Sequence, residues 1–92
     1  MIDLDTIPQP NPDIVCKIVE HEAVLVLPEI GKVKVLNDVG AVIWQLVDGS
    51  RTLQEIAVIL YETFDVNLEK AETDTINFIT ELSDRQLVYL DD

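Results

Sequence analysis

The hydrophobic pattern of this chain changes its period at Asn37, and this change restricts the fold more than any other feature. Residues 32–36 (KVKVL) alternate polar and apolar side chains, which is typical of a half-buried strand. Residues 38–47 instead carry apolar side chains three, four and seven positions apart, the spacing of one face of a helix. Asn37 stands between the two patterns and is a favourable helix N-cap. A strand that passes directly into a helix predicts an α+β domain.

The residues before Asn37 favour two further strands. Residues 14–19 and 23–27 are rich in β-branched side chains, and Glu20–Glu22 lies between them as a short turn. A second turn ends at Gly31, which is free to adopt positive φ. We therefore predict a three-stranded antiparallel meander that ends with residues 32–36.

The residues after Gly49 favour two further helices. Thr52 and Glu55 form a capping box before a helix over 53–63, and Asn67 caps a longer helix over 68–85. Residues 87–90 have the composition of a short final strand. The prediction is a winged-helix-like α+β fold, with a three-stranded antiparallel sheet followed by three helices.

The chain has 92 residues, which suits a single domain. Three alternating prolines predict that residues 1–12 form an extended N-terminal arm, because proline favours extended backbone. The domain is expected over 13–90, with an acidic tail at 91–92. One cysteine excludes an internal disulfide, and the sequence starts without the pattern of a secretory signal. Both features favour a cytoplasmic setting.

The charge is strongly acidic, with 18 acidic and 6 basic residues and a net charge of −12. Such a surface repels nucleic acids and anionic lipid and attracts basic partners, although solubility alone is an equally good explanation. The helix over 68–85 carries only Lys70 and Arg85 beside five acids. We therefore expect no nucleic-acid binding and no membrane binding, despite the helix-turn-helix proportions.

The polar residues give little support to catalysis. His21 is the only histidine and falls in a predicted turn, and Cys16 lies in an apolar strand where a buried structural thiol is expected. The spacing of these residues suits neither zinc nor a nucleophile–base pair. The carboxylate pairs of the last helix are helical neighbours on an exposed face. The prediction is a protein without catalytic residues, metal or cofactor.

The strand over 32–36 is the most suggestive binding element. In a meander it lies at the edge of the sheet, where unpaired N–H and C=O groups can accept a strand from a peptide. Lys32 and Lys34 also have a simpler explanation, since edge lysines prevent aggregation. In the binding hypothesis, the acidic last helix forms the other wall of a groove and faces basic peptide residues with Glu72, Asp74 or Glu81.

The chain from Ile14 to Leu90 resembles the PqqD-like family of peptide-recognition domains. The resemblance is carried by short motifs whose order and spacing are specific together: Leu36-Asn37, Gly40–Trp44, Leu46, Asp48-Gly49, Thr52, Glu55-Ile56, Phe64–Val66, Phe78-Ile79, Leu82 and Leu87-Val88. One departure is Gln86, where many members have glycine. The resemblance implies a domain that binds the leader segment of a ribosomally made precursor peptide by strand addition and itself performs no chemistry.

The resemblance also implies a set of peptide-binding residues. On the strand side these are Lys32, Val33, Lys34, Val35 and Leu36, and on the helix side Asp74, Thr75, Phe78, Ile79 and Leu82. Thr75 and Phe78 are expected to be shared between core and groove, while core packing alone is as good an explanation for Ile79 and Leu82.

The pathway is a finer expectation. The domain is expected to be free-standing, and its motifs look most like the lasso-peptide group, whose partners are a leader-cleaving cysteine protease and an ATP-dependent cyclase. A leader of that group is basic, with Tyr, Pro and Leu anchors. The alternatives are a PQQ-type precursor-peptide chaperone for a radical enzyme, other modified peptides, and a winged-helix regulatory or structural domain.

Overall fold

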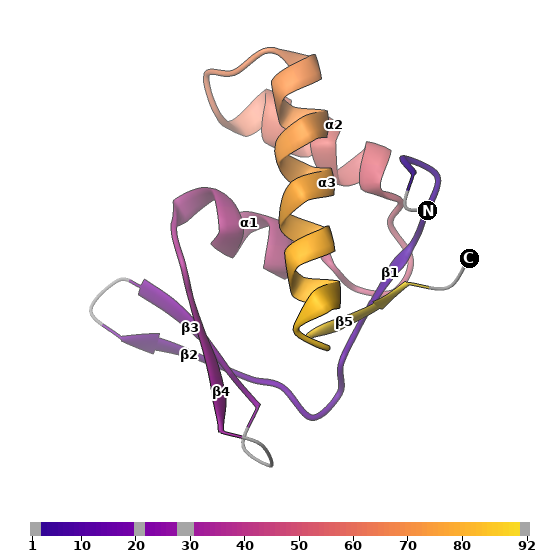
Figure 1. Cartoon of the computed structure of the whole chain (residues 1–92). Coiled ribbons are helices and arrows are strands. Elements are labelled where there is room, and N and C mark those ends of the chain that lie inside the picture. The colour runs from indigo at the N-terminus through magenta and orange to yellow at the C-terminus, as the bar shows by residue number, and fades with distance from the viewer. Residues whose placement is uncertain (1–2, 20–21, 28–30, 91–92) are drawn as a thin grey trace.

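The computed structural model describes residues 3–19, 22–27 and 31–90. Strands β2 (Val15–Val19), β3 (Glu22–Leu27) and β4 (Lys32–Leu36) form an antiparallel sheet in the order β2-β3-β4. Helices α1 (Asp38–Leu46), α2 (Leu53–Thr63) and α3 (Leu68–Asp84) follow. Figure 1 shows the sheet beside the helices, with the β2–β3 hairpin projecting from them. The predicted α+β fold, with a three-stranded antiparallel sheet and then three helices, is confirmed.

The helices begin where the sequence places their caps. Asn37 Oδ1 accepts a hydrogen bond from the Gly40 N–H, and Asn67 Oδ1 accepts one from the Lys70 N–H, each at 2.8 Å. The predicted capping box is complete, because Thr52 and Glu55 exchange side-chain-to-backbone hydrogen bonds. These bonds satisfy N–H groups that have no partner within a helix.

The core lies between the inner face of the sheet and the three helices. The inner residues of β3, Ala23, Leu25 and Leu27, are buried, and the register pairs Ala23 with Leu36 of β4. The helices contribute apolar stripes that include Ile43, Leu53, Ile56, Leu60, Ile79 and Leu82. None of the helices in the described part of the chain has the length and apolar character needed to cross a bilayer.

The N-terminal segment is integrated into the fold more closely than its prolines suggest. Strand β1 (Pro8–Pro10) pairs antiparallel with β5 (Val88–Leu90), as Figure 1 shows, and Pro8 is fully buried. Thr6 and Leu4 also accept backbone hydrogen bonds from Leu53 and Gln54 at the start of α2. The short final strand is confirmed, and it pairs with β1 in a separate two-stranded sheet.

The end of α3 is a Schellman turn around a residue in the left-handed region. Gln86 has φ of +64°. The Leu87 N–H donates to the Leu82 carbonyl at 2.8 Å, and the Gln86 N–H donates to the Ser83 carbonyl at 3.0 Å. Glycine usually occupies this position because it has no Cβ, so Gln86 holds a conformation that is unfavourable for a residue with a side chain.

One prediction about a side chain is wrong. Cys16 was expected to be a buried thiol, but it is exposed. It pairs in register with Leu25, which is fully buried, so the core ends at β3 and does not extend beneath β2. Residues 20–21 and 28–30, which include His21 and most of both predicted turns, lie outside the described residues.

Candidate functional site

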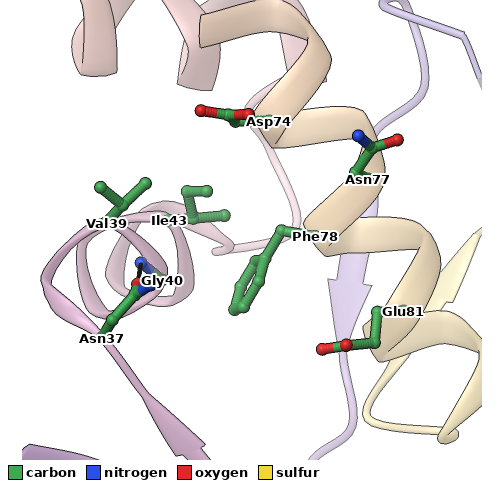
Figure 2. Close-up of a pocket in the computed structure, with 8 residues that line it drawn as sticks. All are labelled: Asn37, Val39, Gly40, Ile43, Asp74, Asn77, Phe78 and Glu81. Carbon is green, nitrogen blue, oxygen red and sulfur yellow. Dashed lines mark hydrogen bonds between the residues drawn. The ribbon is translucent and has the colours of Figure 1, made fainter. Parts of the chain in front are cut away.

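A cleft of about 370 Å³ lies between the start of α1 and the middle of α3. Its floor is apolar, because its apolar residues are buried or half-buried, and its rim is polar, because its polar residues are half-buried or exposed; Figure 2 shows these side chains. The residues that line it are Asn37, Val39, Gly40, Ile43, Asp74, Asn77, Phe78 and Glu81. The four from α3 are spaced three, four and seven positions apart, so they share one face of that helix. This face turns toward the junction at which β4 passes into α1.

Phe78 is the central apolar side chain of the cleft. Its ring extends from α3 toward Gly40 of α1 (Figure 2), and it is half-buried. A Cβ built on Gly40 would lie 3.0 Å from Phe78 Cε1 and 3.1 Å from Cζ. Glycine at this position therefore permits the aromatic ring to pack directly on the α1 backbone.

The rim of the cleft is acidic. Asp74 and Glu81 lie on either side of Phe78 along α3, and Figure 2 shows their side chains extending from α3 toward the side of α1. Asp74 pairs with Lys70 one helical turn away, at 3.3 Å between Nζ and Oδ2. An exposed pair of this kind contributes little to stability and leaves the carboxylate able to exchange partners.

Glu81 joins the helix to the edge of the sheet. Lys34 Nζ of β4 lies 2.5 Å from Glu81 Oε2 of α3. The hydrogen bond and the charge of Lys34 hold the pKa of the Glu81 carboxyl below its ordinary value, against a smaller opposing effect of burial. This ion pair connects β4 to α3 beside the cleft.

Strand β4 provides an open hydrogen-bonding edge beside the cleft. Among the described strands it has a neighbour only on its β3 side. Val35 is 53% exposed on the outer face. A second hollow of about 500 Å³, lined by Glu22, Val35, Leu36, Asn37, Asp38 and Val39, lies at the same junction. The two hollows share Asn37 and Val39, and the Lys34–Glu81 ion pair connects β4 to the α3 wall of the cleft.

The structure separates the ten predicted site residues into four groups. Lys34 and Val35 lie on the β4 edge, and Asp74 and Phe78 line the cleft. The backbone of Lys32 and Val33 belongs to β4, but their side chains lie outside the described part of the structure. The remaining residues are buried in the core: Leu36, Thr75, Ile79 and Leu82.

The burial of Thr75 differs from the expectation that it is shared between core and groove. Its hydroxyl donates to the Ala71 carbonyl one turn earlier at 2.7 Å, and its side chain has no exposed surface. Ile79 and Leu82 are likewise fully buried, as core packing alone would require. All three lie on the face of α3 that packs inward, so they position the cleft wall without forming its surface.

The contribution of α1 to the cleft was not predicted from the sequence. Asn37, Val39, Gly40 and Ile43 line it from that side, and Asn77 adds an amide from α3. Asn37 was interpreted only as a cap and Val39 and Ile43 only as core residues. A signal was present in Gly40, since a glycine in the first turn of a helix costs stability and indicates a close neighbour.

Comparison with known proteins agrees with this architecture. Residues 22–88 match the family model for coenzyme PQQ synthesis protein D (PqqD). A PqqA binding protein from Xanthomonas campestris pv. campestris (strain B100) is 39% identical over 67 residues, which are 73% of this chain and 71% of that protein.

Two solved structures share the fold. A lasso peptide synthetase B1 complexed with the leader peptide superposes with a TM-score of 0.81 at 23% identity, covering 90% of this chain and 98% of that one. The PqqD truncation of Methylobacterium extorquens PqqCD, described as a stand-alone RiPP recognition element, superposes with a TM-score of 0.81 at 24% identity, covering 97% and 95%. The family match over most of the chain and the common fold lead to one conclusion: this protein is a member of the PqqD family.

Proposed function

We propose that this protein is a non-catalytic module that binds the leader segment of a ribosomally made precursor peptide as a strand added to β4. The open β4 edge beside a cleft with an apolar floor and an acidic rim is the observation that carries the proposal. Membership of the PqqD family supports it, as does the likeness to a recognition element and to a leader-peptide complex.

Each part of the site has a distinct role in such binding. The β4 backbone supplies hydrogen bonds that are independent of peptide sequence, and the cleft supplies specificity. An apolar anchor of the leader packs on Phe78 and Val39. A basic residue next to that anchor interacts with Asp74 or Glu81 at the rim, in exchange for Lys70 or Lys34.

The ligand that we favour is a basic lasso-peptide leader with Tyr, Pro and Leu anchors. The protein would deliver it to a leader-cleaving cysteine protease and a cyclase. The net charge of −12 and the acidic rim suit a lysine-containing leader. The second candidate is the precursor peptide of PQQ biosynthesis, because the relative at 39% identity is a PqqA binding protein.

The decisive experiment is a fluorescence-anisotropy titration with both leader peptides on the wild type, Phe78→Ala and Val33→Pro. Phe78→Ala removes the central apolar side chain of the cleft, and Val33→Pro removes one donor and distorts the β4 edge. Lys17→Pro, on the opposite edge strand, is the matched control. Circular dichroism establishes that each variant is folded. We expect tight binding of one leader, lost in the first two variants and retained in the control.

Charge reversal tests the role of the rim separately. Asp74→Lys combined with Glu81→Lys should slow association with a basic leader and flatten its dependence on salt, as stopped-flow kinetics would measure. An unchanged association rate would remove the electrostatic part of the proposal. Failure of both leaders to bind the folded wild type would contradict the proposal and favour a regulatory or structural winged-helix domain.

A further inference from the structure

Strand β2 is exposed on both of its faces. All of its described side chains, Val15 to Ile18, are exposed, and Ile18 is 68% exposed, more than any other large apolar side chain in the described part of the chain. The register pairs Ile18 with Ala23 and Cys16 with Leu25, and both partners are buried on the inner face of β3. The inner face of β2 therefore extends beyond the helices that cover β3.

The outer edge of β2 is also open. Within the described residues, β2 has one neighbouring strand, β3, so the hydrogen-bonding groups along its other side have no strand partner. Proteins usually protect such an edge with charged side chains, a proline or a bulge. Residues 15–19 (VCKIV) carry one charge, that of Lys17, and no proline. An apolar strand with a free edge is suited to pairing with another strand.

Charge indicates what occupies this edge. The protein has 18 acidic residues and a net charge of −12, so a basic partner is drawn to its acidic surfaces and two copies repel each other at most contacts. Residues 15–19 contain no acid, so the residues of β2 themselves bring no carboxylates into the contact. An open backbone edge and an apolar strand are also self-complementary, as a two-fold interface requires.

We propose that β2 pairs antiparallel with β2 of a second copy, which joins the two sheets into one continuous sheet. Full overlap of the strands would place Lys17 opposite Lys17, and like charges in that position are destabilising. Displacing one strand by one side-chain repeat instead places Cys16 opposite Cys16 or Ile18 opposite Ile18. In either register Lys17 lies opposite a valine.

The dimer leaves the candidate peptide site accessible. In the order β2-β3-β4, the two β4 strands lie at the outer edges of the joined sheet. Self-association and strand addition to β4 therefore use different edges. The proposal is independent of the function proposed above, since it requires only the geometry and composition of β2.

Sedimentation velocity over a dilution series tests the proposal with the full chain. We expect the wild type to pass from monomer to dimer as concentration rises, and Ile18→Lys to remain monomeric. Val58→Lys is the matched control, because Val58 is another exposed aliphatic side chain, 37% exposed on α2, and receives the same new charge. It should dimerise like the wild type. Circular dichroism establishes that both variants are folded.

Cys16 supplies an independent readout, since it is the only cysteine of the chain. A flexible bis-maleimide should link two copies of the wild type and of Val58→Lys through this thiol, and should link far less of Ile18→Lys. A wild type that is monomeric at every concentration would overturn the proposal. So would a dimer that survives Ile18→Lys but dissociates in Val35→Lys, because that result would place the interface on β4.

Discussion

Single residues at the ends of helices store strain that substitution can release. Gln86 has φ of +64°, a conformation that costs a residue with a Cβ on the order of 1 kcal/mol. Gln86→Gly should therefore raise the free energy of unfolding by about 1 kcal/mol, as urea denaturation would measure. Arg85→Gly is the control, because Arg85 has φ of −93° and gains nothing from glycine. Equal effects of the two substitutions would contradict the interpretation.

The effect of substituting Gly40 on stability depends on its neighbour Phe78. Alanine is better than glycine inside a helix by about 1 kcal/mol, but the new Cβ would lie 3.0 Å from the Phe78 ring. Gly40→Ala should destabilise the wild type by about 1 kcal/mol, because overpacking outweighs propensity. In a Phe78→Ala background the same substitution should stabilise. A double-mutant cycle by urea denaturation measures this change of sign, and additive effects would show that the two residues do not press together.

At the scale of elements, the Lys34–Glu81 ion pair connects β4 to α3. The folded pKa of Glu81 lies below its unfolded value, so its contribution to stability is present above the unfolded pKa and is lost as pH falls through the folded pKa. Because the Glu81 side chain is 44% exposed, solvent screening keeps the contribution below about 1 kcal/mol.

Glu81→Gln should therefore lower the free energy of unfolding slightly at neutral pH, and the difference from wild type should vanish in acid below the Glu81 pKa. Urea denaturation at a series of pH values measures it. Glu62→Gln, on α2, is the control for loss of one acid from a highly acidic chain. A difference that persists unchanged into acid would assign the effect of Glu81→Gln to packing.

The elements themselves could be predicted closely, and the surfaces between them could not. Periodicity and the caps Asn37, Thr52 and Asn67 gave the start of each helix, because both signals are local in sequence. The inner stripe of α3 was visible, but periodicity does not reveal which part of it borders a cleft. For this reason Thr75 was assigned to the groove although it is buried in the core. Asn77 and the start of α1, which were not predicted, line the cleft.

At the scale of the molecule, long-range pairing was least predictable. The burial of Cys16 was predicted wrongly because a strand pattern does not show how far the helices extend across a sheet. The pairing of β1 with β5 was missed because two prolines in three residues argue against a strand. It is permitted in a two-stranded sheet, where each strand is an edge.

This pairing makes the N-terminal segment a structural part of the protein. Pro8 and Asn11 are buried, and Asn11 donates to the carbonyl of Gln86 at 2.9 Å. Deleting residues 1–11 would expose apolar surface at β5 and remove the hydrogen bonds to the start of α2. The expected loss is on the order of 3–5 kcal/mol, a large part of the stability of a domain of this size.

Thermal unfolding with an added peptide distinguishes the loss of the β1 contacts from a general loss of folding in the deleted protein. Thermal unfolding of the deleted protein should show a lower midpoint, and a synthetic peptide of residues 3–11 should raise that midpoint as its concentration increases, because it binds only the folded state. A peptide of the same composition in scrambled order should have no effect. An unchanged midpoint after deletion would mean that β1 rests on a domain that is stable without it.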